Sequence, residues 1–237
     1  MKKKGALYFQ LDSLKKPVIV FYLIVLAATI VALALNWNTE EAGVSGLEMA
    51  TMIFLFVIGC CSFRDDFLFL IQSGVGRRGI FQTHCLAYGL LCLLLSAVDT
   101  VFVRVLSAVL ASRPGVRYES LASSLLPQME GALGFLANWA LLLAVYLFLF
   151  SFGYLLGVLS YRGGRKITVL LAVGVPVLFF GGLPAFLIGT SGNPFLARVI
   201  QFLFGSYSST LATLLVLTVM FHGIGGLLQN RAQVRTV

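Results

Sequence analysis

Residues 132–160 read ALGFLANWALLLAVYLFLFSFGYLLGVLS, a stretch without a single charged side chain. A helix of about 20 apolar residues is long enough to cross the hydrocarbon core of a bilayer. The run is continuous and does not alternate with a period of two, and in lipid only a helix satisfies its backbone hydrogen bonds within one segment. The stretch therefore predicts a transmembrane α-helix.

The composition extends this prediction to the whole chain. Of its 237 residues, 59% are hydrophobic and only 11% are charged, whereas an ordinary soluble domain has about a quarter of its residues charged. So few polar side chains cannot cover the surface of a soluble domain. We predict an all-α, polytopic membrane protein with six transmembrane helices in one domain, residues 1–237, with spans at about 17–36, 46–63, 80–103, 132–160, 167–189 and 208–228.

The charged residues predict how these spans are oriented. Most of the 17 Lys and Arg residues precede the first span or follow the second, fourth and sixth spans. By the positive-inside rule, both termini are then cytoplasmic. Trp37 and Trp139 fall at the opposite interface, where aromatic residues are enriched. Because the basic residues flank apolar runs, the net charge of +8 indicates a membrane protein and not a nucleic-acid-binding one.

The basic leader before the first span has a helical pattern of its own. Leu7, Tyr8, Leu11 and Leu14 share one helical face, with lysines beside it. This pattern is typical of an amphipathic helix that lies on the inner leaflet. For Lys2–Lys4 a disordered positive tail is an equally good interpretation.

The connection between the second and third spans, residues 63–81, reads FRDDFLFLIQSGVGRRGIF. Charged residues leave the membrane, an apolar stretch from Phe67 to Ile71 follows, and Gly74 and Gly76 allow a turn before a new helix begins. A short apolar helix on the cytoplasmic side must bind to something. Two interpretations remain open: it lies against the inner leaflet, or it binds a cytosolic partner.

A second short helix is predicted at residues 194–204 on the outer side. Pro194 suits the first position of a helix, and Gly205 suits the position after its end. The segment is too short to span, and its polar residues Arg198 and Gln201 share one face. We expect it to enter the outer leaflet or to pack across the end of the bundle. The fifth span before it contains Pro176, Gly181, Gly182 and Pro184 and should be kinked or broken.

The sequence offers little chemistry inside the membrane. Asp99 is the strongest buried charge, and either it bonds a neighbouring helix or it lines a cavity. Gly153 and Gly157 form a small-xxx-small motif, which predicts close helix packing. No set of residues at metal-ligand spacing occurs, and Cys60 and Cys61 are interpreted as packing residues. We therefore expect no metal or cofactor on this chain.

An enzymatic activity is not expected either. The segments around Ser191 and His222 are similar to the nucleophile and base motifs of rhomboid proteases. However, the predicted spans place the two side chains roughly 20 Å apart in depth, and a nucleophile and its base must be about 3 Å apart. The glycine-rich segment 74–79 lacks the Lys-Ser/Thr pair that grips phosphate and magnesium.

Together these features resemble the membrane subunit of type-2 ABC exporters over nearly the full chain. The most specific local similarity is residues 70–78, LIQSGVGRR, which resemble the coupling segment of small bacterial permeases. Among these permeases the chain is most similar to those of peptide exporters, including the phenol-soluble modulin exporter. The resemblance implies a bacterial plasma membrane as the location.

The resemblance also implies partners and residue roles. Two such chains, as a homodimer or as a heterodimer with a similar permease, would pair in the lipid membrane above cytosolic ABC ATPase subunits, which would bind ATP and magnesium. The segment 194–204 would be an outer re-entrant helix. Lys15 and Lys16 would belong to an N-terminal elbow helix, and Asp99, Arg198 and Gln201 would line the pathway or contact other helices. The cytoplasmic coupling helix would contact the ATPase through Arg64, Asp65, Asp66, Phe67, Gln72, Gly74, Gly76, Arg77 and Arg78.

The function expected from this resemblance is ATP-driven export. The 20 Phe residues and the near absence of buried charge favour a hydrophobic or amphipathic cargo, with peptides as the first choice. A membrane scaffold or immunity-type protein without transport is the alternative, and an intramembrane protease comes third.

Overall fold

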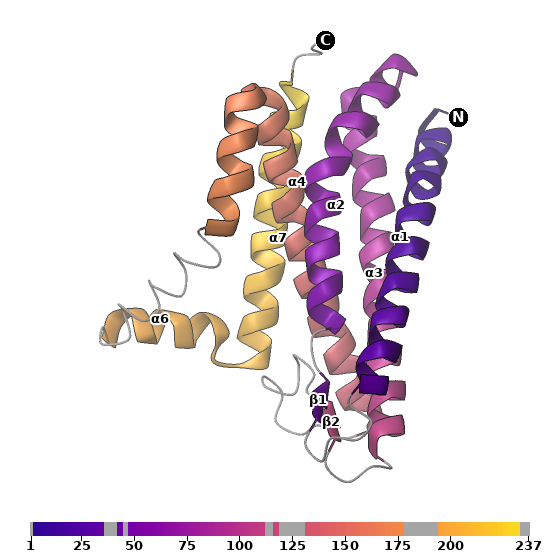
Figure 1. Ribbon diagram of the computed structural model, residues 1–237. Helices are drawn as coiled ribbons and strands as arrows, with labels where there is room; N and C mark the ends of the chain where they lie inside the picture. The colour runs from indigo at the N-terminus through magenta and orange to yellow at the C-terminus, as the bar shows by residue number, and fades with distance from the viewer. Residues whose placement is uncertain are drawn as a thin grey trace.

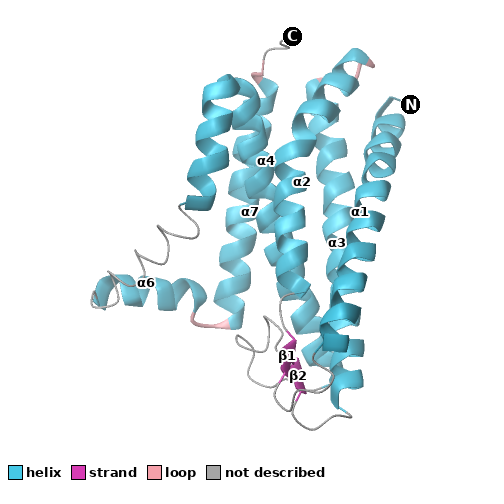
Figure 2. Ribbon diagram, in the orientation of Figure 1, coloured by secondary structure: helices cyan, strands magenta, loops and turns pink. Residues whose placement is uncertain are grey.

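The structure, a computed structural model, describes residues 2–35, 42–44, 47–111, 116–118, 131–177 and 194–232. Long helices run side by side and form a bundle (Figure 1). Two short strands pair at one end of it (Figure 2). The elements are α1 (Lys2–Leu35), β1 (Ala42–Val44), α2 (Leu47–Gln72), α3 (Arg77–Ala111), β2 (Val116–Tyr118), α4 (Gly131–Val177), α6 (Pro194–Phe204) and α7 (Tyr207–Asn230). The predicted all-α class is confirmed.

Four of the described helices are long and apolar enough to cross a membrane, which indicates a multi-pass membrane protein. α2 is not among them: its uncharged run from residue 49 to 63 is about 22 Å long and is followed by Arg64, Asp65 and Asp66. Of the predicted fifth span, residues 167–177 are helical and the remainder lies outside the described residues. The four candidate spans are Lys3–Ala34, Arg77–Val109, Gly131–Gly164 and Tyr207–Asn230.

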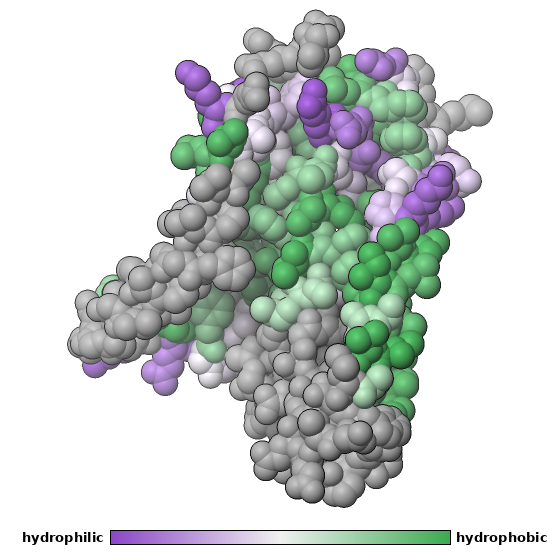
Figure 3. Space-filling model, in the orientation of Figure 1, coloured by the Kyte–Doolittle hydropathy of each residue, from purple (hydrophilic) through white to green (hydrophobic). Residues whose placement is uncertain are grey.

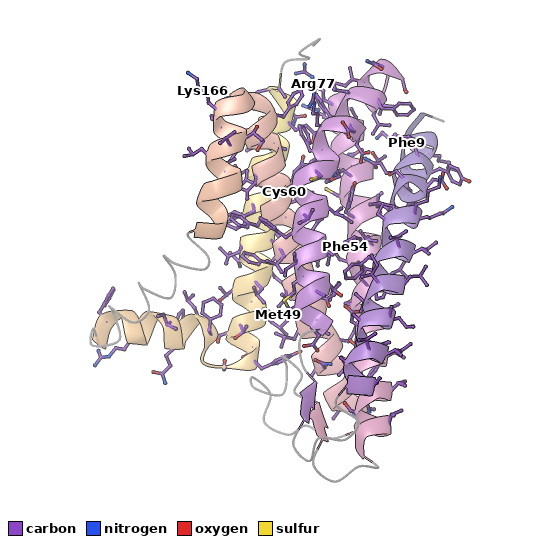
Figure 4. The ribbon with its side chains drawn as sticks, in the orientation of Figure 1. Phe9, Met49, Phe54, Cys60, Arg77 and Lys166 are labelled. Carbon is purple, nitrogen blue, oxygen red and sulfur yellow. The ribbon has the colours of Figure 1, made fainter. Side chains whose placement is uncertain are left out.

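The two ends of the bundle differ in character. Figure 1 shows the start of α1, the α2–α3 turn and the end of α7 at the same end. Arg77 and Lys166 also lie there, far from Met49 (Figure 4). We call this end the basic end. The opposite end carries β1 and β2, which pair in parallel with Ala42 opposite Val116, and α6, which lies across the direction of the bundle helices (Figure 1).

α4 turns back at the basic end. Its helical path is interrupted at Gly164, where φ is 70°, a backbone conformation that favours glycine. After this kink the helix runs back toward the opposite end (Figure 1). The reversal falls between the predicted fourth and fifth spans, of which the fourth is a candidate span and the fifth is described only from residue 167 to Val177.

The closest helix contact joins α2 to α4 through glycines. A Cβ atom added to Gly153 would lie 2.5 Å from the carbonyl oxygen of Phe56, and one added to Gly157 would lie 2.7 Å from that of Cys60. Gly59 on α2 approaches α4 equally closely, since its added Cβ would lie 2.7 Å from the Phe150 oxygen. The predicted packing role of Gly153 and Gly157 is confirmed.

Neither the elbow nor the coupling helix is a separate element, which corrects the sequence prediction. The leader and the first span form one helix, α1, with Pro17 inside it. Its buried stripe of Ala6, Gln10 and Leu14 repeats every four residues, so the leader packs on the bundle along this face. Lys15 and Lys16 are exposed, and the Lys15 Nζ lies 2.9 Å from the Asp12 Oδ1.

The coupling segment likewise continues α2 without a break. Phe63, Phe67 and Leu70 are all buried and follow one another at helical spacing. The same apolar face therefore extends past the charged residues 64–66, which removes any reason for the helix to end at residue 63. α2 ends at Gln72 instead.

Apolar side chains cover much of the outer surface of the bundle. Along α1, Ile19, Leu23 and Ile30 are more than half exposed. Figure 3 shows this hydrophobic surface below the hydrophilic residues of the basic end. Such a surface suits contact with lipid.

α6 confirms the predicted helix 194–204 at both ends. Phe195, Phe202, Arg198 and Gln201 are exposed on it. It is joined to α7 through the Thr213 hydroxyl, which donates to the carbonyl oxygen of Leu203 at 3.2 Å. These features place an amphipathic helix at the outer rim of the bundle.

Candidate functional site

The α2–α3 hairpin is built around a short turn at the basic end. The amide of Gly74 donates to the carbonyl of Ile71 at 2.9 Å, and the amide of Val75 donates to that of Leu70 at 3.0 Å. Gly74 has a φ of 74°, which explains why a glycine stands there. α3 then begins at Arg77. The predicted order of a helix, a glycine turn and a new helix is confirmed.

The interior of this hairpin is packed on the bundle. Phe67 stacks on Phe63 with ring centroids 5.1 Å apart and meets the edge of Tyr161 on α4 at 5.7 Å. The buried Asp66 accepts a hydrogen bond from the hydroxyl of Tyr88 on α3 at 3.1 Å. Burial raises the pKa of Asp66 to about 6, and the Tyr88 hydrogen bond opposes this rise. Asp66 and Phe67 therefore face the bundle and not the surface.

Arg77 is also held within the chain. Its Nη1 donates to the carbonyl oxygen of Asn230 at 2.6 Å. The side-chain amide of Gln229 in turn donates to the Arg77 carbonyl at 3.4 Å. A basic side chain that donates to the carbonyl oxygens of the last turn stabilises a helix, because these oxygens have no hydrogen-bond donor within the helix. Arg77 thus closes the C-terminal end of α7.

The remaining predicted coupling residues form the surface of the hairpin. Arg64, Asp65 and Arg78 are exposed and make no ion pair or hydrogen bond within the part of the chain that the structure describes. Gln72, Gly74 and Gly76 are exposed beside them. These charges are available to a partner, whereas Asp66 and Phe67 are buried and Arg77, although exposed, bonds to the end of α7.

Asp99 lies at a junction of three helices. Its Oδ1 accepts a hydrogen bond from the hydroxyl of Tyr22 on α1 at 2.8 Å, and its Oδ2 accepts one from Tyr146 on α4 at 2.5 Å. The Asp99 side chain is fully buried. Arg198 and Gln201 are not brought to it, because they lie on α6 at the outer rim.

A second buried polar cluster joins α3, α4 and α7 nearer the basic end. The Nε2 of His222 lies 3.0 Å from the Cys85 Sγ, and its Nδ1 lies 3.4 Å from the Ser151 Oγ. His84 packs between the rings of Tyr88 and Tyr154, at centroid distances of 4.3 and 4.5 Å. Tyr154 donates a hydrogen bond to Gln229 of α7. We call residues 84, 85, 151, 154, 222 and 229 the histidine cluster.

Sequence reasoning missed the composition of both clusters, although a signal was present. Tyr22, Tyr146, His84 and Gln229 are polar residues inside or beside long apolar runs, which marks them as interior positions in a membrane protein. Their partners could not be deduced, because each bond joins helices far apart in the chain. Ser191, whose pairing with His222 the sequence analysis rejects on depth, lies outside the described residues.

The clusters do not form a metal site within the described ranges, where no three His, Cys, Asp or Glu side chains lie close enough to hold an ion. Comparison with known proteins adds no assignment: no family model, no curated protein and no solved structure matches the chain. The hairpin at the basic end and the two buried clusters are therefore the features from which we infer a function.

Proposed function

We propose that the chain is the membrane subunit of an ATP-driven exporter of the type-2 ABC kind. In this proposal α2 and the helix that begins after Gly164 complete six spans, and the basic end faces the cytoplasm. A separate cytosolic subunit hydrolyses ATP with magnesium, and this chain performs no catalysis. Two copies, or one copy and a similar permease, pair in the membrane and move a hydrophobic or amphipathic cargo, with peptides as the favoured class.

The observation that carries the proposal is the α2–α3 hairpin at the basic end. Its surface presents charges of both signs, Arg64, Asp65 and Arg78, that have no partner among the described residues. Exposed charges of this kind fix the register of a protein partner and raise its association rate. The exposed charges thus suit the binding of an ATPase subunit.

The interior of the hairpin supports a mechanical role. A force applied at the surface reaches α4 through the Phe67–Tyr161 contact and α3 through the Asp66–Tyr88 hydrogen bond. Dense packing transmits displacement because it is nearly incompressible. A hairpin that only lay on lipid would need neither the buried carboxylate nor the fully buried Phe67.

The test is a charge reversal at the hairpin surface, measured as ATP hydrolysis. The tagged chain is purified from its native membranes with its associated subunits and placed in lipid vesicles. Arg78→Glu should reduce ATP hydrolysis and the recovery of an ATPase subunit together. Lys166→Glu is the matched control, because Lys166 is an exposed cation at the same end outside the hairpin (Figure 4).

Two outcomes contradict the proposal. Recovery of the chain without any ATP-hydrolysing subunit would favour a membrane scaffold. Equal hydrolysis in the Arg78→Glu and Lys166→Glu complexes would show that the hairpin is not where the ATPase binds.

A further inference from the structure

A pocket of about 360 Å³ lies within the bundle, between α3, α4 and α7. α3 contributes Cys85 and Gly89 to its wall, α4 contributes Phe150 and Ser151, and α7 contributes His222 and Gly223. All three helices are candidate membrane spans. The pocket therefore lies at a depth where the surrounding solvent is lipid.

The mouth of the pocket is formed by glycines. A Cβ atom added to Gly89 or to Gly223 would meet no atom of the described residues within 4 Å. Beside them Val219, which also lines the pocket, is 72% exposed on the outer face of α7. Because glycines have no side chain, they leave an opening between α3 and α7 on the exposed apolar side of the bundle. The pocket can therefore be reached from the hydrocarbon core of the membrane.

The polar groups of the pocket are loosely bonded to one another. Ser151 is 2% exposed and lies 3.4 Å from the His222 Nδ1, at the long end of hydrogen-bond distances. A hydroxyl can both donate and accept hydrogen bonds, so Ser151, which lines the pocket, can bond a further group beside His222. The floor of the pocket can therefore accept one more hydrogen-bonding group.

The remaining wall sets the character of the ligand. Phe81, Tyr88, Leu147 and Phe150 supply aromatic and aliphatic surface, and none of the lining residues is Asp, Glu, Lys or Arg. An ionised carboxylate or ammonium would lose its hydration there without a counter-charge, which is costly. The volume is at the lower end of small-molecule sites, which begin at about 300 Å³.

We propose that this pocket binds an uncharged amphiphile that enters from the bilayer, with a single hydroxyl or amide group and a medium-length apolar chain. The polar group contacts Ser151 and His222 at the floor, and the chain lies along Phe81 and Phe150. This site does not depend on export or on an ATPase. It holds whether or not the proposed transport function is correct.

The experiment is photo-crosslinking in phosphatidylcholine vesicles with a medium-chain alcohol that carries a diazirine. The label should attach to peptides of α3, α4 and α7 that line the pocket, and decanol should displace it. Gly223→Leu should reduce this labelling at least tenfold, because the new side chain occupies the mouth and its Cβ atom has room at this position. Gly174→Leu is the matched control, since Gly174 is equally open and lies outside the pocket.

A second variant tests the polar floor. Ser151→Ala should weaken displacement by decanol about twofold to tenfold, the effect of one neutral hydrogen bond, while decane should compete poorly with every variant. The proposal is overturned if decanoic acid in its ionised form competes as well as decanol, or if decane does. It is also overturned if Gly223→Leu and Gly174→Leu are labelled equally, which would be the result if a second copy of the chain covered the seam.

Discussion

Replacing Gly153 by Ala tests the glycine contact between α2 and α4 most directly. The added methyl carbon would lie 2.5 Å from the Phe56 carbonyl oxygen and 3.2 Å from the Cys60 amide nitrogen. Both atoms belong to the backbone and cannot rotate away. The two helices must therefore separate by about 1 Å to restore ordinary van der Waals distances, since optimal contacts lie at about 3.5–4.0 Å.

The size of the effect follows from two opposing contributions. Overpacking a closely packed contact costs about 1–3 kcal/mol, and a radial gap of 0.5–1 Å forfeits about a quarter to a half of the attraction between the facing atoms. Against this cost, alanine stabilises the helix by up to about 1 kcal/mol relative to glycine, because glycine is the poorer helix former. We expect the free energy of unfolding to fall by about 1–2 kcal/mol in Gly153→Ala.

The assay is thermal unfolding of the purified protein in detergent micelles, with Gly174→Ala as control. Both glycines lie on α4, but among the described residues a Cβ atom at Gly174 meets nothing within 4 Å. The control should be as stable as the wild type or slightly more stable, whereas Gly153→Ala should melt several degrees lower. Gly59→Ala should add little to Gly153→Ala, because one separation of the helices accommodates both methyl groups. Equal melting temperatures for Gly153→Ala and Gly174→Ala would refute the close-packing argument.

Three further predictions concern charge and topology. The melting temperature of the wild type should fall as the pH rises from about 4 to about 6, and that of Asp66→Asn should not. Asp99→Leu should destabilise the bundle by about 1–3 kcal/mol for each tyrosine hydroxyl left without an acceptor, and adding Tyr146→Phe should restore part of this in chemical unfolding. In a chain without its own cysteines, Gly43→Cys should react with an impermeant maleimide on intact cells, and Lys166→Cys only after permeabilisation.

The sign of the pH effect follows from the raised pKa of Asp66. The folded protein holds the proton up to about pH 6, whereas the unfolded chain releases it near 3.8. Between these values the folded state binds more protons, so the free energy of unfolding falls as the pH rises, and above pH 6 it no longer changes for this group. A stability that rises through this window and is lost in Asp66→Asn would contradict the burial argument.

The contradicting results for the other two predictions are equally specific. If the double variant Asp99→Leu/Tyr146→Phe is less stable than Asp99→Leu alone, the hydrogen bond is not the source of the cost. Labelling of Lys166→Cys on intact cells would invert the orientation and remove the hairpin from the cytoplasm.

Residues with position-specific backbone chemistry made parts of the fold predictable. Pro194 and Gly205 predicted both ends of α6 correctly, because proline suits only the first turn of a helix and glycine often follows its end. Gly153 and Gly157 predicted a close helix contact because four-residue spacing puts both on one face. These are local rules that a sequence displays directly.

The errors come from charged residues that were used as helix boundaries. Arg64, Asp65 and Asp66 indicate where a chain leaves the hydrocarbon, but a helix continues as long as its apolar face finds a partner. The spacing of Phe63, Phe67 and Leu70 contained this information. At Pro17 the helix loses one backbone hydrogen bond and continues, since Leu14 before it and Tyr22 after it both pack against the core.

The partners of the candidate site were beyond local reasoning. The sequence predicts coupling roles for both Arg77 and Arg78, and both are exposed, yet only Arg77 bonds to the Asn230 carbonyl. Adjacent residues on a helix point about 100° apart, so they meet different neighbours. Only the tertiary contact between α3 and α7 decides which arginine is held within the chain.

This contact gives α7 a distinct place in the proposed mechanism. Helices in lipid gain little from the hydrophobic effect and are held by packing and hydrogen bonds, and α7 is held at both of its ends. Arg77 of the hairpin bonds to its last turn, and Thr213 near its start bonds to Leu203 of α6. Between these ends, α7 is one helix of 24 residues with no proline, about 36 Å long. If an ATPase moves the hairpin, the displacement therefore reaches α6 through a single rigid element, without requiring the α4 kink at Gly164 to change.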